Sequence, residues 1–221
     1  MGKVPRPAQP RPAVPAGVIA VVRAPTAGEA RAIVRGLILA AVPAVELTMT
    51  VPGAVRIIAE FAAAGLVGGT VLGAGTVLDP EACSACAEVG AAFIVSPVTD
   101  PAVLARAHDR GVPYVGGALT PTEVLASMRA GSDAVKLFPV GSVGGAGYLR
   151  ALCEPLPGLR AVVSGGIAAA EVPLLSGRRG ARRLPGRRTD RPGGGPPRRR
   201  GRRRGPRQAG TRRDHGGGRP C

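Results

Sequence analysis

The chain has 221 residues, a length that suits one α/β domain and argues against two full domains. Hydrophobic residues make up 45% and aromatic residues 2%, and Trp is absent, so a core must be built from Ala, Val, Leu and Ile. Parallel sheets that are buried on both faces use these residues. The net charge of +16 lies almost wholly beyond residue 176, because residues 1–176 hold 13 Lys+Arg against 12 Asp+Glu. The nearly neutral body therefore gives no indication of a nucleic-acid or membrane partner.

The remaining composition argues against two further classes of protein. Four cysteines in a chain of this length do not indicate a secreted disulfide framework. No charged segment followed by an apolar one opens the chain, and no run approaches the ~18 apolar residues of a membrane span. We therefore expect a cytoplasmic protein that does not insert into a membrane.

Residues 1–16 contain five prolines, which disfavour both helix and sheet, so we predict a disordered leader and order from about Val18 onward. From there, short β-branched runs alternate with helical runs. The expected elements, in chain order, are a strand at 18–23, a helix at 27–39, a strand at 44–50, a helix at 54–64, a strand at 70–76, a helix from 80 that ends before 90, a strand at 92–96, a helix at 101–110, a strand at 112–116, a helix from 121, and strands at 134–138 and 159–163.

Strand–helix alternation at this spacing predicts parallel βαβ units. Seven consecutive units with short connections favour a parallel (βα)8 TIM-type barrel over an open sheet, although no eighth unit is recognisable. Residues 177–221 contain no Val or Ile, and Leu184 is their only large aliphatic residue. We therefore predict a disordered leader at 1–16, an incomplete barrel at 17–176 and a disordered Arg/Gly/Pro-rich tail at 177–221.

Lys136 and Glu46 are the two charged residues expected inside strands. Burial lowers the pKa of a lysine and leaves a neutral amine that can form an imine with a carbonyl compound. A glutamate near it could move the protons that such chemistry requires. The alternatives are a snorkelling or salt-bridged lysine, and a salt bridge from Glu46 to Arg23 or Lys136. Lys3 is the only other lysine, so the chain does not use lysine as a routine surface residue. We therefore favour a catalytic role for Lys136 together with Glu46.

Glycine and cysteine motifs give weaker signals. Ser164, Gly165 and Gly166 end the last expected strand, where free backbone amides could bind a phosphate or simply form a tight turn. Residues 73–76 resemble a dinucleotide-binding turn only superficially, so we expect no nucleotide cofactor. Cys83 and Cys86 lack two further ligands for a structural zinc, and we predict no metal site. His108 is expected on an exposed helix face.

The chain resembles the bacterial KDPG/KHG aldolase family, whose members act on 2-keto-3-deoxy-6-phosphogluconate and 4-hydroxy-2-oxoglutarate. The matching segments are Val45–Pro52, Gly73–Val77, Phe93–Pro97, Gly117–Glu123, Val135–Pro139 and Ser164–Ile167.

The resemblance implies a class I aldolase that needs no metal or cofactor, releases pyruvate and assembles as a trimer. It implies that Lys136 forms the Schiff base and that Glu46 is the general acid/base. The residues implied to bind the phosphorylated 2-keto acid are Arg23, Thr50, Thr76, Pro97, Phe138, Ser164, Gly165 and Gly166.

Two departures from the family pattern matter. Thr50 stands where many members have arginine, which affects substrate choice more than chemistry. Nothing after Ser176 matches the expected eighth strand and its phosphate contact. We interpret the tail as GC-rich coding DNA read in a shifted frame from about codons 172–177, and an inactive remnant of an aldolase is then an alternative. A second alternative is that the Arg/Gly tail binds nucleic acid without sequence preference.

Overall fold

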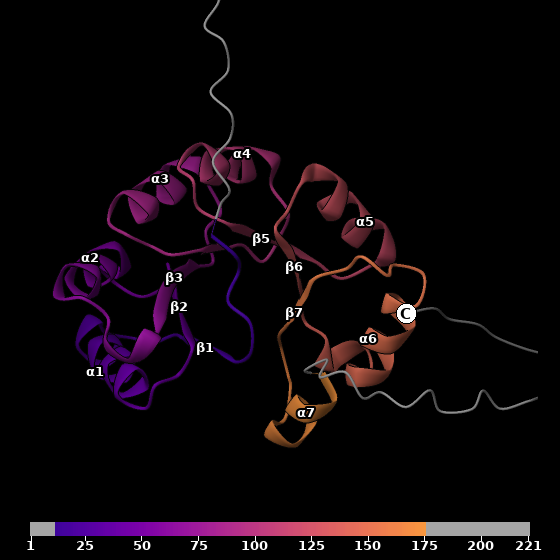
Figure 1. The fold of residues 1–221 in the computed structure, drawn as a ribbon, viewed down its shortest axis with the longest axis horizontal. Coiled ribbons are helices and arrows are strands. Elements are labelled where there is room, and N and C mark those ends of the chain that lie inside the picture. Colours follow the sequence, from indigo (N-terminus) through magenta and orange to yellow (C-terminus); the bar gives the residue numbers. More distant parts are fainter. Residues whose placement is uncertain (1–11, 176–221) are drawn as a thin grey trace, which may run out of the picture. The chain divides into compact units, whose positions relative to one another are not determined.

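The computed structural model describes residues 12–175, which form strands and helices in strict alternation (Figure 1). The elements in chain order are β1 (Ile19–Val22), α1 (Ala27–Leu39), β2 (Ala44–Thr48), α2 (Ala54–Ala64), β3 (Val71–Gly75), α3 (Pro80–Glu88), β4 (Ile94–Val95), α4 (Pro101–Asp109), β5 (Tyr114–Ala118), α5 (Pro121–Ala130), β6 (Ala134–Leu137), α6 (Gly145–Cys153), β7 (Ala161–Val163) and α7 (Val172–Leu175), with short 3-10 helices at Val67–Gly69, Gly141–Val143 and Ala169–Glu171.

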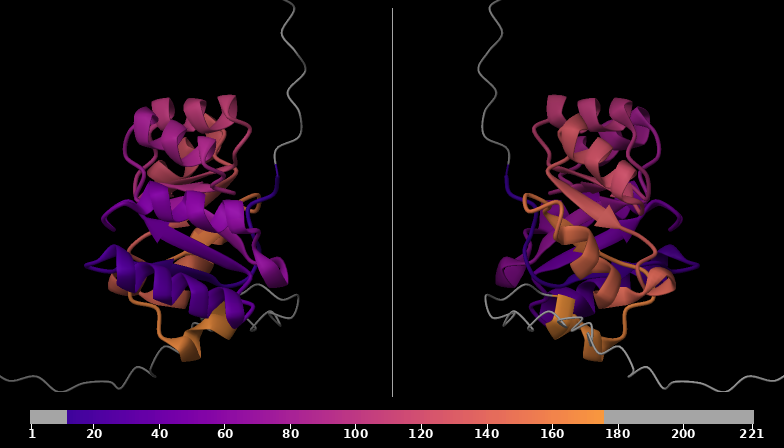
Figure 2. Two further views of the ribbon diagram at one scale, coloured as in Figure 1. Left: turned by 90° about the vertical axis from the view of Figure 1, so that its left-hand side faces the viewer. Right: turned by 90° about the vertical axis from the view of Figure 1, so that its right-hand side faces the viewer.

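The seven strands form one parallel sheet in the order β1 to β7. The sheet curls into an incomplete barrel with the helices outside, as the two side views also show (Figure 2). Within residues 12–175, β1 pairs only with β2 and β7 only with β6, so the ring of strands stays open between them. The predicted parallel TIM-type fold is confirmed for the seven strands within residues 12–175. The predicted tail at 177–221 lies outside the described residues.

Local capping explains why the helices begin where they do. The side chains of Asp79 and Asp100 accept hydrogen bonds from the first turns of α3 and α4, each of which has proline at its first position. Thr120 and Glu123 form the expected capping box at the start of α5. These caps are local, and they could be read from the sequence.

All seven strands differ from their predicted bounds by one or two residues at one end or both, and one helix was not predicted. The fifth strand was predicted at 112–116 but begins at Tyr114, because Pro113 has no N–H and its carbonyl instead accepts a hydrogen bond from Ile94. The fourth strand is only the two residues Ile94–Val95. Helix α6 was not specified in advance, since its segment is rich in glycine, which is a poor helix former.

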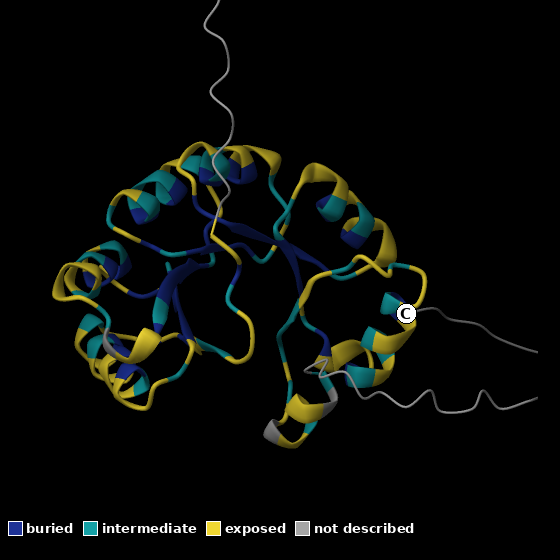
Figure 3. Cartoon of the chain, viewed as in Figure 1, coloured by how far each residue is buried: buried dark blue, intermediate teal, exposed yellow. Residues whose placement is uncertain are grey.

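The central strands are buried (Figure 3), and alternation along the strands divides their residues into an outer and an inner set. One set of strand residues packs outward against the helices, as Val45 and Leu47 do in β2. The other set fills the barrel near the amino ends of the strands. This inner cluster consists of Val14, Ala44, Phe93, Val95, Val115 and Ala134.

Val14 belongs to the segment that we assigned to the leader. Residues 12–16 form no helix or strand, yet the Val14 side chain is only 7% exposed and packs within the inner cluster. The described end of the leader therefore closes the amino end of the barrel, while residues 1–11 lie outside the described residues. No helix between residues 12 and 175 is long and apolar enough to cross a membrane.

Candidate active site

The interior of the barrel changes from apolar to charged one layer above the inner cluster. In β2, Ala44, Glu46 and Thr48 face the interior, because Val45 and Leu47 face the helices. In β6, Lys136 has the same inward position above Ala134. The Glu46 and Lys136 side chains are 3% and 9% exposed, and Lys136 Nζ lies 3.2 Å from Glu46 Oε1. Of the two salt-bridge partners considered for Glu46, the structure therefore selects Lys136.

Two glycines in β3 leave space inside the barrel, Gly75 for Glu46 and Gly73 for the ring of Phe93. A Cβ atom on Gly75 would lie 2.1 Å from Glu46 Oε1, and one on Gly73 would lie 2.5 Å from the Phe93 ring. Neither position could carry a side chain without moving its neighbour. Sequence reasoning missed this role, although glycines at i and i+2 of a buried strand are a signal of close approach on one face.

Lys136 is also enclosed by its own strand end and by β5. Its Nζ lies 5.7 Å from the centroid of the Phe138 ring, within range of a cation–π interaction. Gly117 is the register partner of Lys136 in β5. A Cβ on Gly117 would lie 2.0 Å from the carbonyl carbon of Pro97, so this glycine allows the loop after β4 to pack over the neighbouring strand.

A pair of threonine hydroxyls lies above Glu46 on β2. Thr48 Oγ1 donates a hydrogen bond to the carbonyl of Val22 at 3.1 Å, and it lies 2.8 Å from Thr50 Oγ1. Because the proton of Thr48 is used on Val22, the proton of Thr50 must point to Thr48. Thr50, which is exposed, therefore presents only acceptor lone pairs to the mouth of the barrel.

The loop after β7 exposes backbone amides. Gly165 and Gly166 have φ of 85° and 71°, a conformation that favours glycine. The carbonyls of Ser164 and Gly165 accept hydrogen bonds from Val140 and Gly141 at 3.0 and 2.8 Å. Within residues 12–175, the N–H groups of Gly165 and Gly166 donate no hydrogen bond, which leaves two donors for an anion.

A cavity of about 800 Å³ opens from this layer toward the gap between β1 and β7. Of the predicted site residues, Glu46, Lys136 and Ser164 line it. The other predicted residues follow the carboxyl ends of the strands but do not line this cavity; these are Arg23, Thr50, Thr76, Pro97, Phe138, Gly165 and Gly166. Among them, Thr76 has a positive φ of 57°, which is uncommon for a β-branched residue and marks a constrained position beside the site.

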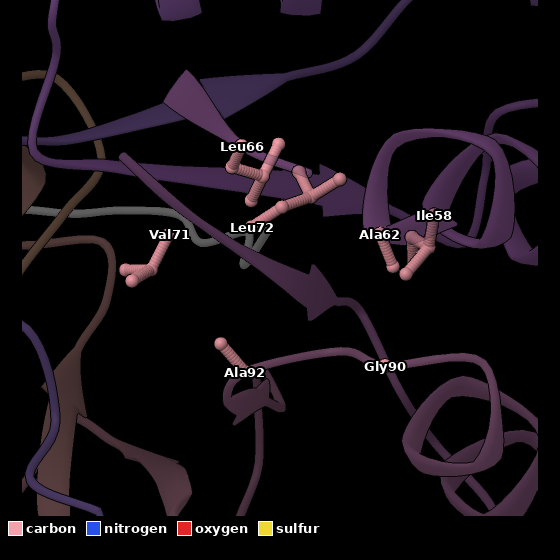
Figure 4. A pocket seen from close by; sticks show the side chains of 7 residues that line it. All are labelled: Ile58, Ala62, Leu66, Val71, Leu72, Gly90 and Ala92. Atoms are coloured by element: carbon pink, nitrogen blue, oxygen red, sulfur yellow. The ribbon is translucent and has the colours of Figure 1, made fainter. Parts of the chain in front are cut away.

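A second cavity, of about 240 Å³, lies between α2 and the starts of β3 and β4 (Figure 4). It is lined only by apolar residues and glycine, as Ile58, Leu72 and Gly90 illustrate, and it offers no group for catalysis. The chemistry therefore belongs to the larger cavity.

His108, Cys83 and Cys86 are titratable residues that do not line the larger cavity. His108 was expected to be exposed, but its side chain is only 20% exposed and Nε2 lies 3.0 Å from Asp133 Oδ2, because the end of α4 packs against the start of β6. Burial raises the pKa of the Cys83 thiol to about 11 and that of Cys86 to about 12. In the described part of the chain, no three His, Cys, Asp or Glu side chains gather into a metal-binding group.

Comparison with known proteins gives a consistent result. The profile of a family described as KDPG and KHG aldolase matches residues 13–176. A probable 2-dehydro-3-deoxy-6-phosphogalactonate aldolase of Rhizobium meliloti is 35% identical over 76% of this chain and 76% of its own length. A 2-dehydro-3-deoxy-phosphogluconate aldolase of Treponema pallidum is 39% identical over 44% of this chain, which spans less than half (46%) of that relative.

A solved structure shares the fold. The 2-keto-3-deoxy-6-phosphogluconate aldolase of Zymomonas mobilis, in a crystal structure with 3-phosphoglycerate, superposes with a TM-score of 0.64. It is 26% identical, and the match covers 72% of this chain and 74% of that one. The curled sheet and its helices therefore have a counterpart in an experimental structure.

Proposed function

Because the chain belongs to the KDPG and KHG aldolase family, we propose that it is a class I aldolase that cleaves a 2-keto-3-deoxy acid to pyruvate and an aldehyde. The observation that carries the proposal is the 3.2 Å contact between Lys136 Nζ and Glu46 Oε1 inside the barrel. Imine chemistry needs an amine and a proton carrier at one carbonyl carbon, and these two groups supply both.

Formation of the imine is the first task of the pair. Glu46 accepts a proton from the Lys136 ammonium, and the neutral amine attacks the C2 carbonyl of the keto acid. The resulting carbinolamine loses its hydroxyl as water when Glu46 returns a proton to that oxygen. The product is an iminium ion, whose positive nitrogen lies where the ammonium lay, beside the ring of Phe138.

Cleavage of the carbon–carbon bond uses the same two groups. Glu46, again a carboxylate, takes the proton of the C4 hydroxyl, and the C3–C4 electron pair moves into the iminium to give an enamine while C4 leaves as an aldehyde. Protonation of C3 and addition of water at C2 then release pyruvate and restore the amine. The Glu46 carboxylate occupies the space beside Gly75 and already lies next to Lys136. It can therefore act in each step without moving to a new position.

The substrate that we propose is a phosphorylated 2-keto-3-deoxy acid. Thr76 and Pro97 hold the pyruvate moiety, while Arg23 and Phe138 line the pocket. Ser164 and the free amides of Gly165 and Gly166 receive the phosphate, a role supported by their positive φ and unpaired N–H groups. The acceptor lone pairs of Thr50 suit a hydroxyl of the substrate better than a carboxylate or phosphate.

Reductive trapping tests the proposal directly. The protein is incubated with pyruvate and borohydride, and its mass is then measured. The expected result is one reduced pyruvyl adduct on Lys136. Because Lys3 is the only other lysine in the chain, peptide mapping assigns the adduct without ambiguity.

Matched variants separate chemistry from folding. Lys136→Arg keeps a cation beside Glu46 and should abolish trapping, whereas Lys3→Arg should leave it unchanged. Glu46→Gln keeps the shape of the side chain and should slow trapping by about 10²- to 10⁴-fold, the usual contribution of a general acid/base. A folded protein that gives no adduct, or an adduct on Lys3 alone, would contradict the proposed activity.

We also propose that the protein assembles as a homotrimer, uses no cofactor and acts in the cytoplasm. Sedimentation velocity of the purified chain tests the trimer, and a monomer at all concentrations would contradict it.

The shifted reading frame is tested on the DNA, where a neighbouring frame beyond codon 177 should encode a Val/Ala/Gly-rich strand.

A further inference from the structure

The two edges of the sheet face one another across the larger cavity. Its lining includes Val18, Ile19 and Val21 from the β1 side and residues 161–164 from β7, with Val172 and Leu175 of α7 beside them. Val21 is the register partner of the buried Glu46, so it belongs to the interior of the barrel, yet it is 48% exposed. Val18, just before β1, is 54% exposed. Within residues 12–175, the barrel is therefore open along this one side.

The geometry of the edges restricts what can close this side. Both edge strands run parallel to their neighbours, and no other strand within residues 12–175 pairs with the backbone N–H and C=O groups on their outer sides. A parallel barrel of this type closes with eight strands, and the sheet formed by residues 12–175 has seven. One further strand in the same direction would pair with β1 and β7 at once, whereas an antiparallel strand would break the pattern on both sides.

We propose that the slot between β1 and β7 binds one parallel β-strand supplied by a separate polypeptide. The bound segment alternates small residues, which face Lys136 and Glu46, with β-branched residues, which face outward and meet Val172 and Leu175. The binding depends on backbone pairing and apolar burial and requires no catalytic step, so it stands or falls independently of the aldolase activity.

Residues 177–221 do not have the composition of such a strand. Residues 177–221 contain 17 Arg, no Val or Ile, and Leu184 as the only large aliphatic residue. The slot already contains Lys136 and Arg160 against the single acid Glu46, so a cationic segment would be repelled. A second copy also fits poorly, because each of its strands is held in its own sheet beneath helices. A free segment without net positive charge is the occupant that fits.

A labelled synthetic peptide provides the test. The peptide carries about six strand residues that alternate valine and alanine, followed by a short amphipathic helix, and has no net positive charge. Its control has the same composition with the alternation shifted by one residue, which turns every valine to the other face. The expected result is saturable binding of the first peptide to the full chain with a Kd below ~1 mM, and binding of the control that is at least about tenfold weaker.

Hydrogen exchange then locates the bound peptide. Added peptide should slow exchange of the amides of β1 and β7 and leave those of β3 and β4 unchanged. Val18→Lys, which adds a charge at an exposed position of the slot, should weaken binding, whereas Leu39→Lys, at a position that is 76% exposed in α1, should not.

Three outcomes would overturn the proposal. These are no binding at millimolar peptide, equal binding of both peptides, and protection of β1 and β7 by self-association without any peptide. Since none of these measurements uses Lys136 as a nucleophile, peptide binding is measured on the same wild-type protein that is tested by trapping with pyruvate. Loss of trapping with retained binding would then count against the aldolase activity alone.

Discussion

Valine occurs in the central strands β2, β4, β5 and β6 and in the edge strands β1 and β7 alike, but the two groups of strands have different surroundings. All residues of those central strands are buried, whereas β1 has one buried residue and β7 has none. Both edge strands consist of Ala, Val and Ile. Burial in a parallel sheet is thus set by the presence of a neighbour on each side, and not by residue type. Glu46 and Lys136 both lie in central strands, so the closed part of the sheet fixes their geometry.

The largest difference should be found in a matched pair of core truncations. Ile94→Ala in β4 removes a fully buried side chain and should lower the free energy of unfolding by about 2–5 kcal/mol. Ile19→Ala in β1 removes a partly buried side chain beside the slot and should lower it by less than half as much. Urea unfolding of both variants measures the difference, and equal losses would contradict the contrast between centre and edge.

Gly75→Ala tests whether the central strands position the carboxylate. The new Cβ would lie 2.1 Å from Glu46 Oε1 and must displace the whole carboxyl group. Because a misplacement of ~1 Å can reduce a rate about 100-fold, trapping with pyruvate should slow by that order. Gly36→Ala is the control, since its Cβ would meet nothing within 4 Å in α1. Unchanged trapping in Gly75→Ala would show that Glu46 needs no fixed position.

A smaller effect is expected from the helix caps on the two sides of the molecule. Thr120→Ala removes the capping box of α5, which lies between the central strands β5 and β6, and should lower the free energy of unfolding by about 1 kcal/mol. Thr26→Ala removes the simple cap of α1, next to the edge strand β1, and should have a smaller effect. Thermal unfolding of the two variants under one buffer condition makes the comparison, which fails if Thr26→Ala is the more harmful.

The smallest effect is the pH dependence of the same cap. The N–H groups of Thr120 and then Leu119 donate to the Glu123 carboxylate and hold its pKa below the usual value. A lowered carboxyl pKa in the folded state stabilises the protein above the unfolded pKa of ~4.3, and this contribution is lost as the pH falls through the folded pKa. Urea midpoints measured from neutral to acidic pH should therefore fall less steeply in Glu123→Gln than in the wild type. Identical profiles would contradict the role of this cap.

The sequence was most informative where local chemistry decides the structure. The bounds of α1 and α2 agree with prediction, since Thr26 caps the first and Gly65 ends the second. The fifth strand was displaced because Pro113 contributes a carbonyl but no N–H to the sheet. Helix α6 depends on tertiary packing, as when Tyr148 donates its hydroxyl proton to the carbonyl of Leu119, and such a contact cannot be read from a glycine-rich segment.

Part of the site could be predicted in the same way. Glu46 and Lys136 were identified because a charge inside an apolar strand is costly unless it is paired or used. Their mutual contact and the space left by Gly73 and Gly75 depend on which residues face one another across the barrel. The burial of Val14 is the clearest failure of local reasoning, since its proline-rich surroundings resemble those of an unfolded segment.

Val14 has a practical consequence for anyone who shortens this protein. A truncation that removes the N-terminal prolines would also remove Val14, which covers the amino end of the barrel below Lys136 and Glu46. Water could then reach Lys136 from the amino end of the barrel as well as from its carboxyl end. The first strand begins at Ile19, but the exclusion of water from the barrel interior begins earlier, at Val14.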